Sequence, residues 1–408
     1  MKIAIFTEVY RPIVNGVVTS IDSLAEQLRI LGHDVFTFAP HIPKGAESAG
    51  RVFRMPSLPL PARTEYRLTL PLVARRNKAR FLSQCDVIHS HSLFITGWMA
   101  SYYARRRFRM PLIYTYHTLL ERYAHYSPLG PRLTSQLTRE LTKTYANAAD
   151  AVIVPTKAVA AELRKHGVSA PICVVPTGID IDAFRRADRA TRLAIRDRFG
   201  IPHDAPLLLL VSRLAQEKNV PLAVEALQRL RQRLPAAHLL LVGNGPRRHA
   251  LTAHVREAGL EGVVHFAGSV EHSEIHSFYA ASDVFVFPSV TETQGLVLAE
   301  AFAAGLPVVA LDNPQTRDVF GEHLAGEIVA DAESMANALW ELICNRERRL
   351  TAVTHAKTAA ATFDARATAG RVLAIYEAVV SNLRGGTSLV PENAFVDLFT
   401  EEAGSSVS

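Results

Sequence analysis

The chain has 408 residues, of which 48% are hydrophobic and 21% charged, and its formal net charge is +6. This is the composition of a globular protein with an ample core, and the length predicts two domains. No apolar run reaches the length of a membrane span, and the N-terminus turns acidic too early, at Glu8, for a signal peptide. The three cysteines lie far apart without metal-like spacing, which favours a reduced, cytoplasmic setting.

The first half of the chain alternates strands and helices. It opens with a strand over residues 2–7, continues through a loop around Gly16, and enters an amphipathic helix over 19–31 that Gly32 ends. The apolar segments that follow predict strands at 34–39, 86–89, 112–115 and 151–154, with helices between them. This alternation indicates a parallel, doubly wound sheet.

The second half repeats this pattern after residues 176–180. Its predicted strands cover 206–211, 238–242, 263–267, 284–288 and 306–310. We therefore expect an α/β protein with two doubly wound, Rossmann-like domains facing a central cleft. Ligands of such sheets bind at the carboxyl ends of the strands.

The same pattern predicts the domain boundaries. The first domain is expected to span residues 1–180 and the second 200–363, with a hinge around 176–205. A last helix over about 364–383 is expected to pack back onto the first domain. The polar tail at 385–408 is expected to be mobile.

Two carboxylates, Glu292 and Glu300, flank a predicted helix start that follows a buried strand. The backbone N–H groups around 294–296 would then lie at a helix N-terminus, which favours anions, and Gly295 would let a ligand approach closely. A phosphate suits the N–H groups, whereas carboxylates suit sugar hydroxyls. The segment therefore indicates a nucleotide-sugar site, although either glutamate alone would fit an ordinary surface or capping residue.

The motifs, in this order and spacing, make the chain similar to retaining glycosyltransferases of family 4, which have the GT-B fold. The resemblance covers residues 1–383 and rests on Glu292-x7-Glu300, Ser212-Arg213-Leu214-x2-Glu217-Lys218, Gly243-Asn244-Gly245-Pro246, Pro176-Thr177-Gly178-Ile179-Asp180 and the Gly16 loop. It implies a hexosyltransferase with no cofactor, whose second domain binds the nucleotide-sugar donor and whose first domain binds the acceptor.

The resemblance also implies roles for the residues of the second domain. Arg213 and Lys218 match the phosphate-binding cations, which would stabilise charge on the departing diphosphate. Glu300 matches the carboxylate that holds the ribose, and Glu292 the one near the transferred sugar. The backbone segment near the sugar and diphosphate matches Gln294, Gly295, Leu296 and Val297. Gly243 and Gly245 match the lining of the nucleotide pocket, and a simple turn explains these two glycines equally well.

In the first domain, Gly16 matches the loop glycine that approaches the donor diphosphate. Asn15 stands where many relatives have a second glycine, which puts the approach of that part of the loop in question. His117 matches the active-site histidine near the transferred sugar, without an assignment as general base. We interpret His89 and His91 as loop and packing residues because no third metal ligand lies nearby.

The mechanism implied by the family is retention without a metal. The Asp180-Ile181-Asp182 triplet resembles a metal-binding motif of another glycosyltransferase fold, but it falls in the predicted hinge. No residue of the first domain is an evident carboxylate nucleophile. We therefore expect attack on the same face, with the departing phosphate taking the acceptor proton.

The opening, 8–20, and the segments 114–118 and 123–126 are similar to bacterial diacylglycerol glucosyltransferases. These are peripheral membrane proteins that transfer glucose from UDP-glucose to diacylglycerol, which would place this chain at the inner face of the cell membrane. The stretch 68–82 mixes apolar and basic residues, and it fits either a helix on an anionic surface or an ordinary helix with one core face.

Charge favours the lipid interpretation. Residues 1–185 hold 24 Lys and Arg against 13 Asp and Glu, whereas the remainder holds 21 against 26. Such an excess suits anionic headgroups or nucleic acid, and no nucleic-acid motif is present. The alternatives are a GDP-mannose-dependent mannosyltransferase, a transferase to a soluble sugar or polysaccharide, a nucleotide-sugar 2-epimerase and a non-catalytic binding protein.

Overall fold

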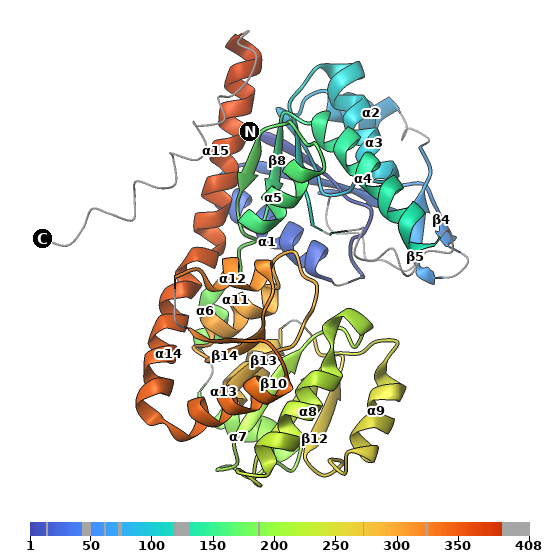
Figure 1. The fold of residues 1–408 in the computed structure, drawn as a ribbon. Helices are drawn as coiled ribbons and strands as arrows, with labels where there is room; N and C mark the ends of the chain where they lie inside the picture. The colour runs from blue at the N-terminus through green and yellow to red at the C-terminus, as the bar shows by residue number, and fades with distance from the viewer. Residues whose placement is uncertain are drawn as a thin grey trace, which may run out of the picture. The chain divides into compact units, whose positions relative to one another are not determined.

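The computed structural model describes residues 1–13, 15–42, 50–60, 63–71, 76–117, 119, 130–186, 188–271, 273–322 and 325–385. The chain forms two compact units (Figure 1). The first contains residues 1–178 and the chain from 365 onward, and the second contains 179–364. The predicted mobile tail from 386 onward and the segment 123–126 lie outside the described residues.

The first unit is built on a seven-stranded parallel sheet with the strand order β3-β2-β1-β6-β7-β8-β9. The order turns between β1 and β6, the position where doubly wound sheets bind ligands. Its strands are β1 (Lys2–Phe6), β2 (Asp34–Pro40), β3 (Val52–Met55), β6 (Val87–Ser90), β7 (Leu112–Thr115), β8 (Ala151–Val154) and β9 (Ile172–Val174). A separate antiparallel hairpin pairs β4 (Ser57–Leu60) with β5 (Arg63–Thr69).

Helices cover both faces of this sheet, so its strands are apolar on both sides. Ile3 and Ile5 of β1 pack in one core, and Ala4 and Phe6 pack in the other. The helices of the unit are α1 (Gly16–Ile30), α2 (Arg76–Leu82), α3 (Ile95–Ser101), α4 (Pro131–Asn147), α5 (Lys157–Lys165) and α15 (Ala365–Gly385), with a π-helical segment, η1 (Tyr102–Phe108), after α3.

Helix α1 begins at Gly16, three residues earlier than predicted, because Asn15 caps it. The Asn15 side chain accepts a hydrogen bond from Val18 N at 3.0 Å, which satisfies one of the free N–H groups of the first turn. At the other end, Gly32 adopts a φ of +86°, as the sequence predicted for a residue that ends a helix. Helix α15 packs on α1, and Tyr376 of α15 is fully buried.

The prediction of one helix over 68–82 is wrong at its start. Leu68 belongs to β5 and pairs with Leu58 across the hairpin. Helix α2 begins only at residue 76, and its Phe81 packs edge-on against Phe36, with ring centroids 4.6 Å apart. The described end of this stretch therefore directs an aromatic side chain into the core.

The second unit contains a six-stranded parallel sheet with the order β12-β11-β10-β13-β14-β15, which turns between β10 and β13. Its strands are β10 (Leu207–Val211), β11 (His238–Val242), β12 (Val264–Gly268), β13 (Val284–Phe287), β14 (Val308–Leu311) and β15 (Gly326–Val329). Its α-helices are α6 (Ile181–Arg185), α7 (Arg189–Arg198), α8 (Val220–Arg231), α9 (Arg248–Glu257), α10 (Ile275–Ala281), α11 (Leu296–Ala303), α12 (Pro314–Phe320), α13 (Ala332–Cys344) and α14 (Arg346–Ala360).

The chain passes between the units twice, and tight backbone contacts hold both passages. In the second unit, Ile179 N donates a hydrogen bond to Phe363 O at 2.8 Å, and Ile179 bridges to Asp364. In the first unit, a Cβ on Gly178 would lie 2.6 Å from the Ala365 Cα, closer than real atoms approach. Only glycine therefore fits at residue 178.

Candidate active site

In the second unit, candidate residues gather at the carboxyl ends of β10 and β13, on either side of the turning point. Arg213 and Lys218 follow β10, and Glu292 follows β13. The two loops are joined by a backbone hydrogen bond from Val290 N to Glu217 O, 3.0 Å long. The fold thus brings together residues that lie far apart in the sequence.

Lys218 and Glu292 form an ion pair between Nζ and Oε1. Only 17% of the Lys218 side chain and 14% of the Glu292 side chain are exposed, so removing one partner would leave a poorly hydrated charge. Sequence reasoning assigned the two residues separate roles and did not predict this pairing. Arg213, by contrast, is exposed and forms no ion pair with any described residue.

Helix α11 presents its N-terminus beside this ion pair. Gly295 precedes the helix with a φ of +75°, and a Cβ there would lie 3.0 Å from Cζ of Phe287. The first turn, with Leu296 and Val297, carries the N–H groups that no helical carbonyl can pair. Gln294 is buried immediately before it. These four residues therefore form the predicted turn into a helix N-terminus.

Glu300 lies in the second turn of α11 and is buried. Its Oε2 accepts a hydrogen bond of 2.6 Å from the Tyr279 hydroxyl of α10. Burial raises the pKa of Glu300, while the bond from Tyr279 acts in the opposite direction. Tyr279 was missed by sequence reasoning because its apolar neighbours mark it as an ordinary core residue, and only the packing of α10 on α11 reveals its partner.

A structural reason that sequence reasoning did not consider explains why residues 243 and 245 are glycines. A Cβ on Gly243 would lie 1.9 Å from Ser212 O, and one on Gly245 would lie 2.4 Å from Leu214 O. The loop after β11 therefore packs directly on the loop that carries Arg213. The two glycines act on the site by allowing this close approach.

In the first unit, His117 lies at the carboxyl end of β7, beside His91 at the end of β6. The His91 Nδ1 and His117 Nε2 atoms are 2.7 Å apart, and the rings are stacked with centroids 5.0 Å apart. His91 therefore belongs to the surroundings of His117 and is more than a packing residue. Gly16, the other candidate of this unit, is exposed at the first position of α1.

His89 lies within β6, as the predicted strand over 86–89 implied, and its interpretation as a loop residue is wrong. Its Nδ1 contacts the Tyr376 hydroxyl and its Nε2 contacts Thr115 Oγ1, both at 2.6 Å. Burial lowers the pKa of His89 to about 3 and that of His117 to about 4, and it lowers the pKa of His91 well below the ordinary value. All three imidazoles are therefore neutral at pH 7.

The Asp180–Asp182 triplet has a local structural role. The Asp180 side chain accepts a hydrogen bond from Ala183 N at 3.2 Å and so caps α6, while Asp182 is exposed. Within the described part of the chain, no group of three or more His, Cys, Asp and Glu side chains is placed to hold a metal ion.

The first unit also carries an exposed aromatic stripe at four-residue spacing, formed by Phe94 just before α3, Trp98 within α3 and Tyr102 at the start of η1. These side chains are 50%, 40% and 53% exposed. Arg106 and Arg107 follow in η1, are exposed and form no ion pair with any described residue. In the ranges that the structure describes, no helix is both long and apolar enough to cross a bilayer.

Comparison with known proteins identifies the family. The model of Glycosyltransferase Family 4 matches residues 14–183, and that of Glycosyl transferases group 1 matches residues 191–359. The alpha-monoglucosyldiacylglycerol synthase of Acholeplasma laidlawii is 31% identical to this chain, over 76% of the chain and 80% of that protein. A GDP-mannose-dependent alpha-mannosyltransferase of Mycobacterium tuberculosis is 29% identical, over 85% of this chain and 89% of that protein.

A solved structure shares the fold. The HepE protein of Anabaena, crystallised with UDP and glucose, superposes with a TM-score of 0.75 at 20% identity, over 93% of this chain and 100% of that one. This likeness agrees with the two Rossmann-like sheets and with the two matching family models. The chain therefore belongs to the family 4, group 1 glycosyltransferases and is a hexosyltransferase with the GT-B fold.

Proposed function

We propose that this enzyme transfers glucose from UDP-glucose to a lipid acceptor such as diacylglycerol at a membrane surface, with retention and without a metal. The observation that supports a lipid acceptor is the exposed aromatic stripe, which the arginines of η1 follow. The Acholeplasma laidlawii relative, a monoglucosyldiacylglycerol synthase, supports the same assignment.

The donor is assigned to the second unit. Arg213 is an exposed cation, and the first turn of α11 offers N–H groups, so both suit a diphosphate. Glu300 supplies a carboxylate for ribose hydroxyls, oriented by Tyr279. Glu292 supplies one for the transferred sugar, and Lys218 fixes its position.

The proposed reaction occurs on one face of the sugar. The bond between the anomeric carbon and the phosphate oxygen breaks, a bond from the acceptor oxygen forms, and the acceptor proton passes to the departing phosphate. The ion pair with Lys218 makes Glu292 a poor nucleophile, because the ammonium group stabilises the carboxylate. Trapping a covalent glycosyl group on Glu292 by mass spectrometry would contradict this mechanism.

His117 is proposed to contact a hydroxyl of the transferred hexose. Its neutral ring can donate or accept a hydrogen bond without bringing a charge. The Gly16 loop is proposed to approach the diphosphate, and the Asn15 cap holds the start of α1 in place for this role.

The aromatic stripe is the proposed membrane contact. Phe94, Trp98 and Tyr102 present apolar area, and the indole N–H and the phenol hydroxyl add polar edges that suit the headgroup boundary. Arg106 and Arg107 complement anionic lipids. Flotation with vesicles with and without phosphatidylglycerol tests this contact. The triple variant F94S/W98S/Y102S should lose flotation, and binding that persists would remove the lipid argument.

A donor and acceptor screen tests the whole assignment. UDP-glucose, UDP-galactose and GDP-mannose are each incubated with diacylglycerol in mixed micelles, and products are identified by mass spectrometry. Glucosyldiacylglycerol from UDP-glucose is the expected product. Reactions without acceptor should leave the donor sugar unchanged, whereas epimerised UDP-sugar would indicate a 2-epimerase.

A second candidate is GDP-mannose-dependent mannosyl transfer. It is favoured by the Mycobacterium tuberculosis relative, which aligns over 85% of this chain. The same screen separates the two, because a mannosylated product from GDP-mannose would replace the glucolipid.

Independence from metal needs its own test, because the family resemblance is its only support. Purified enzyme is assayed in EDTA, then with added Mg²⁺ or Mn²⁺. Unchanged turnover is expected. Loss in EDTA with recovery on adding the ion would contradict the proposal.

A further inference from the structure

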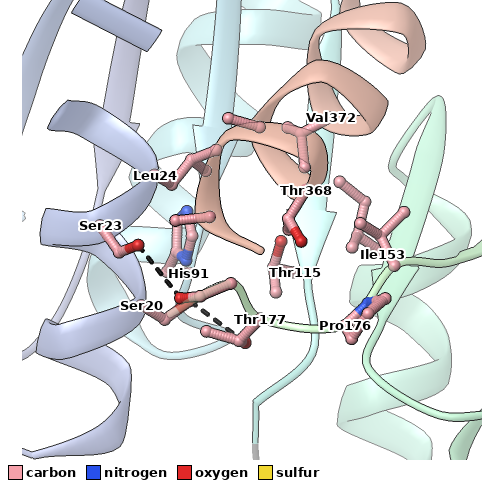
Figure 2. A pocket seen from close by; sticks show the side chains of 14 residues that line it. Ser20, Ser23, Leu24, His91, Thr115, Ile153, Pro176, Thr177, Thr368 and Val372 are labelled. Atoms are coloured by element: carbon pink, nitrogen blue, oxygen red, sulfur yellow. Dashed lines mark hydrogen bonds between the residues drawn. The ribbon is translucent and has the colours of Figure 1, made fainter. Parts of the chain in front are cut away.

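A small pocket lies behind His91 in the first unit. It is about 30 Å³ in volume, and its polar lining comes from Ser20, Ser23, His91, Thr115, Thr177 and Thr368. Figure 2 shows side chains from α1, from the start of α15 and from the segment around Pro176 surrounding it. The pocket has room for one or two water molecules and is too small for a sugar or a phosphate group.

Two buried polar atoms that line this pocket lack partners. His91 Nε2 and Thr368 Oγ1 form no hydrogen bond with any described residue, and both residues are only 6% exposed. A buried polar group without a partner is destabilising, because folding removes its hydrogen bonds to water without replacing them. In folded proteins such groups are commonly satisfied by ordered water, which is the one ligand class that fits this volume.

The opposite side of the His91 ring contacts the candidate active-site histidine. His91 Nδ1 lies 2.7 Å from His117 Nε2. A neutral imidazole carries one N–H, so whichever hydrogen bond Nε2 makes decides whether Nδ1 donates or accepts. The state of Nδ1 in turn decides which nitrogen of His117 carries the proton. The lining of the pocket contains no charged side chain that would set the His91 tautomer instead.

We propose that an ordered water molecule in this pocket joins Thr368 to His91, and that His91 is a positioning residue that fixes the ring orientation and tautomer of His117. The proposal rests on the proposed function only in giving His117 a part in transfer. The link starts on α15, the last helix of the chain, so residues more than 250 positions apart in sequence act on one imidazole.

Variants of His91 and Thr368 test the proposal. His91→Phe keeps an aromatic ring and removes both nitrogens, whereas His91→Asn keeps a polar atom near the position of Nδ1. Thr368→Val removes the hydroxyl at constant volume, and Thr368→Ser retains it as the matched control. Circular dichroism establishes that each variant is folded.

The first readout is NMR of the ligand-free protein labelled with ¹⁵N-histidine, which distinguishes the two tautomers. We expect His117 to hold a single tautomer in the wild type and in Thr368→Ser, and a mixture in His91→Phe and Thr368→Val. Because no substrate is present, this result is independent of the donor and acceptor. If the tautomer responds as expected but no hexose transfer is found, the proposed function fails and the water link stands.

The second readout is steady-state kinetics. His91→Phe should lower kcat by roughly tenfold to a hundredfold, the range seen when a partner that orients a histidine is removed. The KM for the donor should be unchanged, and His91→Asn should recover part of the loss. An unaltered His117 tautomer in His91→Phe, or identical spectra for Thr368→Val and Thr368→Ser, would overturn the proposal. If His91→Phe does not fold, the Thr368 pair decides alone.

Discussion

The two units carry different side chains at the same edge of their sheets, neutral in the first unit and charged in the second. At the turning point of the first sheet and on the neighbouring strand β7, His89 and His91 are buried, His117 is half-buried, and all three imidazoles are neutral. At that of the second, Lys218 and Glu292 form an ion pair and Arg213 is an exposed cation. Yet the first unit contains the basic excess of the sequence. The net charge of a domain therefore describes its surface as a whole. The residues in the loops after the strands decide whether its site is charged or neutral.

This difference fits a division of labour. A departing diphosphate gains negative charge and needs fixed cations, whereas hydroxyl groups need donors and acceptors without charge. Substitutions in the charged site are therefore expected to have the larger effects, because charge develops there during the reaction.

Arg213→Ala is expected to have the largest effect. If Arg213 stabilises the departing diphosphate as proposed, removing this cation should lower kcat/KM by about 10²–10³-fold, the range for loss of one transition-state donor. Stability should change little because Arg213 is exposed. Arg256→Ala is the matched control, since this arginine is exposed in the same unit and pairs with the exposed Glu261. Equal losses in the two variants would show that Arg213 has no special role.

Glu300→Gln should weaken UDP binding and stabilise the protein. Loss of a charged hydrogen-bond acceptor should cost about tenfold to a hundredfold in affinity. The pKa of Glu300 is raised by burial, so its stability contribution is present at acid pH and lost as pH rises through the folded value. Above the folded pKa the buried charge of Glu300 destabilises the fold, and glutamine removes that charge, so Tm should rise.

Calorimetric titration with UDP and thermal melting measure both effects of Glu300→Gln. Tyr279→Phe should also weaken UDP binding but lower Tm, because it removes the hydrogen bond that stabilises the charged form of Glu300. A Glu300→Gln variant with a lower Tm and unchanged UDP binding would assign Glu300 to the core alone.

The Lys218–Glu292 pair should show strong energetic coupling. Lys218→Met and Glu292→Gln each leave one charge in a site that is less than one-fifth exposed, and the double variant leaves none. We expect a coupling free energy of about 1–3 kcal/mol in urea unfolding followed by Trp340 fluorescence. The exposed pair Arg256 and Glu261 should give less than about 1 kcal/mol. Equal coupling in the two cycles would contradict the importance of burial.

Most of the fold could be predicted from the sequence, since apolar runs mark buried strands. Three predicted strands, at 112–115, 151–154 and 238–242, have the observed bounds. The pairings within the sites could not be predicted in this way. The partners in His91–His117, Tyr279–Glu300 and Lys218–Glu292 lie 26, 21 and 74 residues apart, and spacing along a chain does not encode such contacts.

Acid should destabilise the first unit more steeply than the second. A histidine with a lowered pKa stabilises the fold above its unfolded value of 6.5, and this contribution is lost as pH falls toward the folded value. Among the described residues, the first unit holds four such histidines, His33 and the contacting His89, His91 and His117, with the pKa of His117 at about 4. The described part of the second unit holds two, His238 and His265, and the raised pKa of Glu300 acts in the opposite direction.

The two tryptophans of the chain allow the units to be followed separately, since Trp98 belongs to the first and Trp340 to the second. In W340F the remaining Trp98 reports the first unit, and in W98F Trp340 reports the second. Between pH 6.5 and 5, above the ordinary pKa of a carboxylic acid, each of these histidines should contribute up to about 1.4 kcal/mol per pH unit. The unfolding free energy reported by Trp98 should therefore fall faster, and His117→Asn should reduce its slope. Parallel slopes for the two probes would mean that the neutral histidines do not set the first unit apart.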